Sequence, residues 1–190
     1  IRRDLHWITS HIPDDAHAHA IDITISESVL VVMGPHARQF LQPLIPQSLA
    51  NDDFAFGTMQ PIEIGHAVGR AHRVTYVGEL GWELYIPADM SAHVFETLMA
   101  RRKDHDLALC GLHALDSCRI EKAFRHFGHD ISNEDHVLEA GLGFAVKEDK
   151  MAGRFGSMIG ADAVRAKRND GLSKRLMQFC LKDREPLLYH

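Results

Sequence analysis

Cysteine is scarce in this chain of 190 residues, and its three cysteines do not have the pattern of a disulfide framework. Cys110, Cys118 and Cys180 are odd in number, widely scattered and without Cys-x-x-Cys spacing. Such usage is typical of a reducing compartment. We therefore predict a cytoplasmic location.

Clustered positive charge is also missing. The formal net charge is -5, and the one basic cluster, between Arg165 and Arg175, is interrupted by a polar loop. Proteins that bind nucleic acids neutralise phosphates with a basic surface, so we predict no nucleic-acid partner. The chain has no apolar run of membrane-spanning length, and it does not open on a basic-then-apolar signal peptide. We predict no membrane contact.

Several motifs that mark catalytic or metal sites are absent. The sequence contains no GxGxxG, no GxxxxGK[ST], no Gly-x-Ser-x-Gly and no HExxH. Fourteen histidines are present, yet no His-x3-His pair falls on a predicted helix and no cysteine is near enough to complete a site. The obvious histidine groupings are His17/His19, His113/His136 and His126/His129. We predict no metal site.

Apolar periodicity predicts helices and strands in alternation. The predicted strands are 20–25, 29–33, 59–64, 71–77, 82–87 and 174–181. The predicted helices are 1–12, a segment that follows Gly34-Pro35 and stops before Pro46, 89–102, 111–124 and 159–168. Asp89 or Ser91 is the predicted N-cap of the third. Strands joined by hairpins indicate an α+β fold and not a doubly wound parallel sheet.

The stretch Tyr76–Tyr85 is predicted to connect two strands, 71–77 and 82–87, in a hairpin whose turn contains Gly78 and Gly81. Alternation along the second strand places Trp82, Leu84 and Ile86 on one face and Glu83 and Tyr85 on the other. The Glu83 carboxylate is thus predicted to point away from the core, and the strand that carries it is rigid. From the residues alone, Glu83 is either a plain solvent-facing residue or part of a site.

Two later segments carry less specific signals. The predicted helix 111–124 has an apolar stripe, Leu112, Leu115 and Cys118, and charged residues spaced for ion pairs at Asp116/Arg119 and Glu121/Arg125. These pairs predict a solvated face. Further on, Gly141 and Gly143 beside Phe144 indicate either close backbone packing or a ligand wall.

Four motifs occur in order along the chain. They are Y-x-G-E-x-G-W-E at Tyr76–Glu83, G-x-x-A-x-D-S-x-R-x-E at Gly111–Glu121, G-H-D-I at Gly128–Ile131, and L-E-A-G-L-G-F-A-V-K at Leu138–Lys147. Together they closely resemble the folate-binding module of the glycine-cleavage aminomethyltransferase superfamily. The segment Arg3–Ile8 and the Gly-Pro turn at Met33–Ala37 are also similar to that family, so the resemblance runs from end to end.

Within the superfamily, Arg119–Gly128 is more similar to the C-terminal module of the sarcosine and dimethylglycine dehydrogenases than to the stand-alone aminomethyltransferase. The resemblance implies tetrahydrofolate as cofactor, a small N-methylated amine as substrate and 5,10-methylenetetrahydrofolate as product. In that mechanism a flavin domain oxidises an N-methyl group to an iminium, and the folate domain captures the carbon. FAD is then expected only in a separate upstream domain that is not in this chain.

The resemblance also implies which residues form the binding site, because individual positions of this sequence match binding residues of the family. Glu83 matches the glutamate that grips the pterin, Tyr76 matches a tyrosine that lines the same pocket, and Tyr85 is implied as a wall residue. A pterin edge presents adjacent N–H donors, and one carboxylate can accept two of them in parallel. The aminomethyltransferases have an arginine where this chain has Leu115, so a contact to the benzoyl-glutamate tail is not carried over.

The family's catalytic aspartate belongs to a first subdomain, before the segment matched by Arg3–Ile8. No residue here matches it, so the catalytic group is unassigned and the chain alone is expected to be inactive. We expect a fragment that holds the central folate-binding subdomains, with mixed or antiparallel sheets and packed helices. Residues 1–173 form the predicted folate-binding domain, and 174–190 are expected to begin a truncated β-barrel subdomain.

Three other functions stay open at this point. The first is a stand-alone glycine-cleavage aminomethyltransferase, which requires a lipoyl carrier protein. The second is a non-catalytic folate-binding or regulatory module of the same fold. The third is a demethylase that uses another methyl donor.

Overall fold

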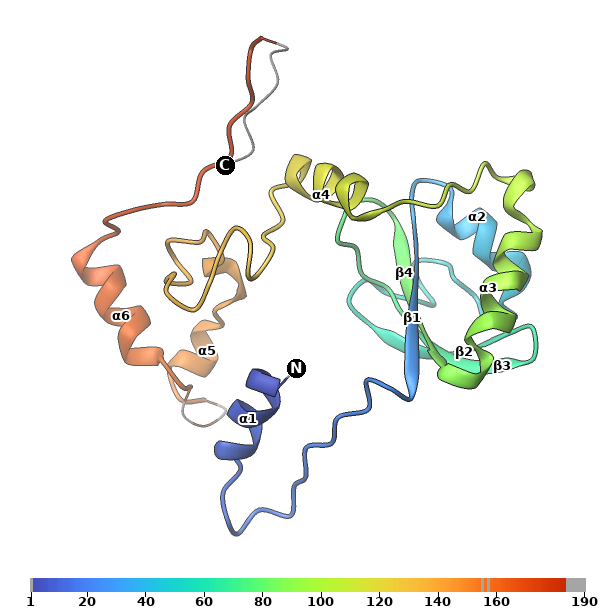
Figure 1. Ribbon diagram of the computed structural model, residues 1–190. Helices are drawn as coiled ribbons and strands as arrows, with labels where there is room; N and C mark the ends of the chain where they lie inside the picture. The colour runs from blue at the N-terminus through green and yellow to red at the C-terminus, as the bar shows by residue number, and fades with distance from the viewer. Residues whose placement is uncertain (1, 155, 157, 184–190) are drawn as a thin grey trace. The chain divides into compact units, whose positions relative to one another are not determined.

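The computed structural model describes residues 2–154, 156 and 158–183, and the chain forms two compact units, Ile1–Leu115 and Asp116–His190 (Figure 1). The first unit contains a four-stranded sheet with helices, and the second is built from helices and turns. The prediction of an α+β fold is confirmed. In the described part of the chain, no helix is long and apolar enough to cross a membrane.

An antiparallel sheet is the centre of the first unit. Its strands are β1 (Glu27–Met33), β2 (Met59–Ile64), β3 (Ala67–His72) and β4 (Gly81–Pro87), and their spatial order is β1-β4-β3-β2. Strands β2 and β3 form a hairpin, whereas β1 pairs with β4 from a distant part of the sequence. Strand β4 is therefore hydrogen-bonded on both sides, and its side chains are held on a rigid support.

One face of the sheet packs against α2 (Ala37–Leu41) and α3 (Ser91–Ala100) to form the core. Trp82, Leu84 and Ile86 are fully buried on this face, as alternation along β4 predicts. Burying such a side chain contributes about 1.5–3 kcal/mol. This burial determines which face of β4 turns toward the core, and so it also determines which face carries Glu83 and Tyr85.

Three of the remaining helices lie close to the predicted ranges: α1 (Arg2–Ser10), α4 (Leu112–Glu121) and α6 (Ala161–Asp170). The short helix α5 (Glu148–Met151) was not predicted. The predicted N-cap of α3 is wrong: Met90 holds that position without a side-chain hydrogen bond, and Asp89 lies in a preceding 3-10 turn. The Ser91 hydroxyl is instead 2.5 Å from the Ser28 hydroxyl on β1.

The predicted strand 71–77 is largely wrong, because β3 occupies 67–72. The tight turn at Gly65 and His66 lets β3 begin early, and Gly65 has a positive φ of 59°. Beyond Arg73 the chain leaves the sheet, since the Thr75 hydroxyl accepts a local hydrogen bond from the Val77 N–H at 3.2 Å. The loop from β3 to β4 therefore spans 73–80, although the two strands pair antiparallel as predicted.

The predicted strand 20–25 does not form. Asp22 accepts hydrogen bonds from both the backbone N–H and the hydroxyl of Thr24, at 2.9 and 2.6 Å, and these bonds make a turn. The isoleucines that suggested alternation remain exposed. They are Ile21, Ile23 and Ile25. Side-chain hydrogen bonding prevails here over the apolar pattern.

In the second unit, Met151, Ala161 and Val164 form a small core. The predicted strand 174–181 is absent from the described residues, and this segment is irregular. It is held by isolated contacts, among them the Leu176 N–H donating to the Glu139 carbonyl at 2.9 Å. Residues 184–190, which belong to the predicted barrel segment, lie outside the described residues.

Candidate functional site

The face of the sheet turned away from the core carries two of the three residues predicted to bind folate. Glu83 and Tyr85 are half-buried on β4, two positions apart, so their side chains leave the strand on the same side. The strands on either side place four residues directly opposite them in register. These are Val29 and Val31 on β1, and Arg70 and His72 on β3.

Glu83 and Tyr85 are in direct contact. The Tyr85 hydroxyl donates a hydrogen bond to Oε2 of Glu83 at 2.8 Å. This bond raises the pKa of Tyr85, with burial and the negative charge of Glu83 acting in the same direction. The phenol therefore stays protonated as a donor, and it restricts the Glu83 carboxylate to one orientation.

An ion pair from the flanking strands supports Tyr85. Nη2 of Arg70 lies 2.5 and 2.6 Å from the two carboxylate oxygens of Glu27, so the pair joins β3 to β1 across β4. The guanidinium carbon of Arg70 lies 5.8 Å from the centre of the Tyr85 ring. Arg70 thus lies over the face of the ring, and the four residues Glu27, Arg70, Tyr85 and Glu83 form a polar row.

Tyr76 lies in the loop that leads into β4 and not on the sheet itself. This loop is fastened to the end of β1, because the Gly34 N–H donates to the Leu80 carbonyl at 2.8 Å and the Thr75 hydroxyl lies 3.6 Å from Sδ of Met33. Gly81 allows the close approach, since a Cβ there would lie 2.4 Å from Cγ of Met33. The structure thus places Glu83 and Tyr85 together, with Tyr76 on the adjoining loop.

The free acceptor capacity of Glu83 in this row fits a flat ligand that has paired N–H donors. Oε2 of Glu83 accepts one hydrogen bond from Tyr85, and among the described residues Oε1 accepts none. An ionised carboxylate can accept about four hydrogen bonds, so Glu83 has capacity for two parallel N–H donors. The exposed Val29 and Val31 beside it offer apolar contact to a ring.

Sequence reasoning did not predict the buried arginine of the second unit. Arg119 on α4 was expected on a solvated face, yet it is only 1% exposed. Its Nε donates to Asp116 at 2.8 Å and its Nη1 to the Phe124 carbonyl at 3.0 Å, and a further ion pair joins it to Asp130. The Asp116/Arg119 spacing predicted the first of these contacts, but the side chain faces inward.

The apolar residues of α4 do not form the expected buried stripe. Leu112 and Cys118 are exposed. Leu112 lies seven residues before Arg119 and therefore on the same side of the helix, yet Arg119 is the residue of α4 that is buried. The Arg125 side chain packs against Gly141, since a Cβ there would lie 2.5 Å from Nη2 of Arg125, whereas Phe144 is exposed.

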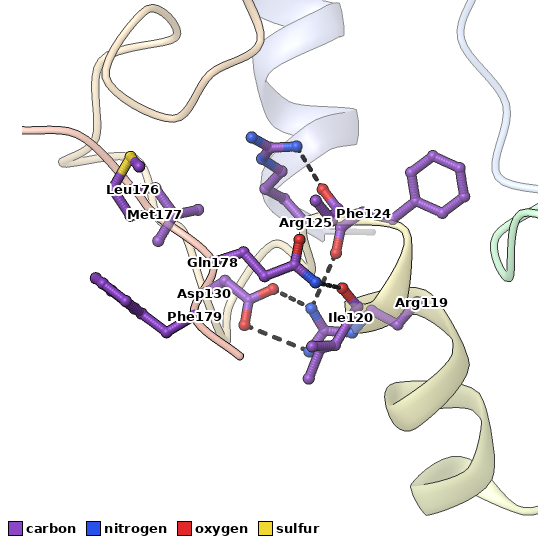
Figure 2. Close-up of a pocket in the computed structure, with 10 residues that line it drawn as sticks. Arg119, Ile120, Phe124, Arg125, Asp130, Leu176, Met177, Gln178 and Phe179 are labelled. Atoms are coloured by element: carbon purple, nitrogen blue, oxygen red, sulfur yellow. Dashed lines mark hydrogen bonds and ion pairs between the residues drawn. The ribbon is translucent and has the colours of Figure 1, made fainter. Parts of the chain in front are cut away.

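A hollow of about 280 Å³ lies beside Arg119. Figure 2 shows Arg119 and Ile120 on one side of it and the segment Leu176–Phe179 on the other, with dashed lines from Asp130 to Arg119. The Gln178 side chain reaches across and donates to the Ile120 carbonyl. The lining is mainly apolar. Arg119 and Asp130 are paired with each other, and Arg125 donates to the carbonyls of Ala123 and Ala140.

The two aspartates that hold Arg119 are stabilised as anions. The Arg119 hydrogen bond lowers the pKa of Asp116. At Asp130 burial acts to raise the pKa, but hydrogen bonds from Arg119, from the His126 N–H and from His129 prevail and lower it. This cluster is thus a structural ion network.

Metal ligands do not gather in the described parts of the chain. Within them, no group of three or more His, Cys, Asp or Glu side chains is arranged to hold a metal ion. His126 and His129 stack on each other with ring centres 5.7 Å apart, and their Nδ1 atoms lie near Asp116 and Asp130, at 3.7 and 3.3 Å respectively.

Comparison with known protein families identifies the chain. The profile of the GCVT N-terminal domain matches residues 1–150. This chain belongs to that family. The resemblance to the aminomethyltransferase superfamily, inferred from four motifs, is therefore confirmed.

Relatives of this family member include both enzyme branches named in the sequence analysis. 4-Methylaminobutanoate oxidase (formaldehyde-forming) from Paenarthrobacter nicotinovorans is 36% identical over 91% of this chain and 20% of its own length. Human mitochondrial sarcosine dehydrogenase is 34% identical over 95% of this chain and 19% of its own length. An aminomethyltransferase from Halothermothrix orenii is 33% identical over 97% of this chain and 49% of its own length.

The chain thus spans about one fifth to one half of the length of these curated relatives. Among solved structures, aminomethyltransferase T of the glycine cleavage system from Bartonella henselae matches with a TM-score of 0.50 and 18% identity. The match covers 78% of this chain and 63% of that one, and it supports the fold assignment.

Proposed function

We propose that this chain is the folate-binding part of a methylglycine dehydrogenase-like enzyme. The full enzyme would transfer a one-carbon unit from a small N-methylated amine to tetrahydrofolate and form 5,10-methylenetetrahydrofolate. Membership of the GCVT family supports the folate assignment, and the relatives named as sarcosine dehydrogenase and 4-methylaminobutanoate oxidase support the choice of amine.

The observation that carries this proposal is the orientation of Glu83. Its carboxylate faces away from the core on a central strand, one oxygen is held by Tyr85, and the other accepts no hydrogen bond from the described residues. In the proposed complex Glu83 accepts the paired N–H donors of the pterin, Tyr85 holds the carboxylate in register, and Tyr76 lines the pocket from the adjoining loop.

Tetrahydrofolate would supply the nitrogen atoms that take up the one-carbon unit. The residues of this chain bind and orient it, and none of them is assigned as the catalytic acid or base. No dinucleotide-binding fingerprint occurs in the sequence, so we place FAD in a separate domain of the full enzyme.

The direct test is calorimetric titration of the whole chain with tetrahydrofolate under anaerobic conditions, before and after Glu83→Gln. Hydrogen bonds to a charged group are worth about 1.5–3 kcal/mol, so the substitution is expected to weaken binding roughly 10–100-fold. Glu63→Gln is the matched control, because Glu63 lies on β2 of the same sheet and is exposed. Equal affinity of the Glu83→Gln and wild-type chains would remove Glu83 from the site.

The stand-alone aminomethyltransferase is the second candidate. One observation favours it: the Halothermothrix orenii aminomethyltransferase is 33% identical over 97% of this chain, an identity similar to that of the dehydrogenases. Assays of the full gene product separate the two. Oxidation of an N-methylated amino acid with an artificial electron acceptor supports the dehydrogenase, whereas ammonia release from an aminomethylated lipoyl carrier protein supports the aminomethyltransferase.

The cytoplasmic location is a further proposal, which rests on three exposed and unpaired cysteines. The human relative is named as mitochondrial, and that compartment is also reducing toward thiols. Imaging of a fluorescent fusion of the full gene product would distinguish the two locations in a eukaryotic host.

A further inference from the structure

Two arginines meet at one side-chain oxygen in the first unit. Nη2 of Arg38, on α2, lies 2.6 Å from Oδ1 of Asn51, and Nη2 of Arg73, just after β3, lies 2.8 Å from the same atom. Backbone carbonyls fix both side chains. Nε of Arg38 donates to Leu49 at 2.8 Å, and Nη1 of Arg73 donates to Phe54 at 2.6 Å.

These two positive charges have no carboxylate partner. Among the described residues, the ion pairs of the structure include neither Arg38 nor Arg73. Burial lowers the pKa of Arg73, and the nearby charge of Arg38 lowers it further. Like charges this close repel each other, and the only acceptor they share is a neutral amide.

The cluster also has hydrogen-bonding capacity left over. Nε of Arg73 is buried without a partner, and so is the indole Nε1 of Trp82 beneath it. The two guanidinium carbons lie 5.7 and 5.8 Å from the Trp82 ring centre, so the ring contacts both cations. Each guanidinium carries five N–H donors, and only two of each set donate to the described residues.

We propose that Arg38, Arg73 and Asn51 form a binding site for one small tetrahedral oxyanion of the phosphate class. The bonds to Asn51 are at the surface, so an anion can reach them from solvent. A tetrahedral anion presents oxygens in several directions and can therefore accept from two guanidiniums that belong to different elements. Trp82 and Glu83 project to opposite faces of β4, so this site is separate from the proposed folate site.

The test measures the melting temperature of the whole chain with inorganic phosphate, sulfate, acetate and chloride at equal ionic strength. Phosphate and sulfate are expected to raise the melting temperature by about 2–4 °C relative to chloride, because a ligand of the folded state stabilises it by mass action. Acetate is expected to give less than half of that shift. If phosphate raises the melting temperature no more than chloride does, the proposed site is wrong. If acetate raises it as much as phosphate does, the site does not select tetrahedral anions.

Asn51→Asp is the decisive variant, because it places a carboxylate of nearly the same shape between the two cations. It is expected to raise the melting temperature by a few degrees without added anion, and to abolish the phosphate shift. Asn133→Asp makes the same charge change at an exposed turn position of the second unit and is the control. If Asn51→Asp is no more stable than Asn133→Asp, or if it keeps the phosphate shift, the proposal is wrong.

Discussion

At the scale of single residues, Arg119 connects several parts of the second unit. Its guanidinium contacts Asp116 within α4, the Phe124 carbonyl beyond the helix and Asp130 farther along the chain. One buried cation thus ties three separate chain segments together. A buried charge that loses its partners is costly, so this network is sensitive to change at its centre.

Replacement of Arg119 by methionine should reduce the free energy of unfolding by about 2–4 kcal/mol, because two aspartates and a carbonyl lose their common donor. The value is below that of a fully buried pair, since the aspartates are partly exposed. Urea titration followed by circular dichroism measures it. Arg154→Met breaks the exposed pair with Asp149 and is expected to change stability little. Equal stabilities of the two variants would contradict the assigned role of Arg119.

Ala123 ends the turn after α4 in a left-handed conformation, with φ of 57°. This conformation costs an L-residue about 1–2 kcal/mol, whereas glycine adopts it freely. Ala123→Gly should therefore stabilise the protein by about 0.5–1 kcal/mol after the greater freedom of glycine in the unfolded chain is subtracted. Ala166→Gly, inside α6, is the opposite control and should destabilise by about 1 kcal/mol. Thermal unfolding of both variants tests the difference in sign.

The sequence predicted the face of Glu83 and Tyr85 correctly because strand alternation is a local property, and the fully buried Trp82 and Leu84 confirm it. It could not predict the burial of Arg119. The partners of that arginine at 124 and 130 come near only after the left-handed turn at Ala123. The sequence did contain one signal for this burial. The first of these motifs, G-x-x-A-x-D-S-x-R-x-E, supplies Arg119 and Asp116, and the second, G-H-D-I, supplies Asp130.

At the scale of elements, the β2–β3 turn determines the register of the sheet. Gly65 has φ of 59°, and the His66 N–H that follows donates to Nε2 of His93 on α3 at 2.9 Å. The two imidazoles stack with ring centres 5.1 Å apart. The turn is thus fastened to a helix of the core.

Gly65→Ala should destabilise the first unit by about 1–3 kcal/mol, because the new Cβ would lie 2.3 Å from Nε2 of His93 and the positive φ disfavours alanine. A double-mutant cycle with His93→Ala separates the two causes. If the clash contributes, the double variant is more stable than the sum of the single changes predicts. Strict additivity would leave only the backbone conformation as the cause.

Element positions were predictable where apolar alternation and core burial agree, as in β1, β2 and β4. They were mispredicted where β-branched residues lie outside the hydrogen-bonded strands of the sheet. Val74, Thr75 and Val77 have the composition of a strand, but the early turn at Gly65 completes the pairing of β3 before the chain reaches them. Composition alone does not contain that register information.

At the scale of the whole molecule, acid sensitivity is concentrated in the second unit. Among the described residues, five carboxylates of this unit have a lowered pKa, and each accepts a hydrogen bond from a cationic side chain. In the first unit the pKa of one carboxylate, Asp22, is lowered, by hydrogen bonds from the neutral Thr24. The five are Asp116, Asp130, Asp135, Glu139 and Glu148. A carboxylate with a depressed folded-state pKa stabilises fully above its unfolded-state value, and this contribution is lost as the pH falls through the folded-state value.

The second unit should therefore lose stability before the first unit as the pH falls from about 5 to 2. In this range the five carboxylates become protonated, because their folded-state pKa values lie below the ordinary values of about 3.9–4.3. Hydrogen–deuterium exchange read by mass spectrometry measures this for each unit separately. The protection factors of amides in 116–183, which are corrected for the intrinsic pH dependence of exchange, are expected to fall at a higher pH than those in 27–100. A simultaneous fall in both segments, or an earlier fall in 27–100, would contradict the role of these ion pairs.

The strand order β1-β4-β3-β2 has a consequence for the folding pathway. The β2–β3 hairpin closes across two residues and can form in microseconds, whereas pairing of β1 with β4 requires closure of the long segment 34–80 and carries a larger entropy cost. We expect β1 to dock last. The Glu27–Arg70 pair, and with it the full polar row around Glu83, would then be completed only in the final step of sheet assembly.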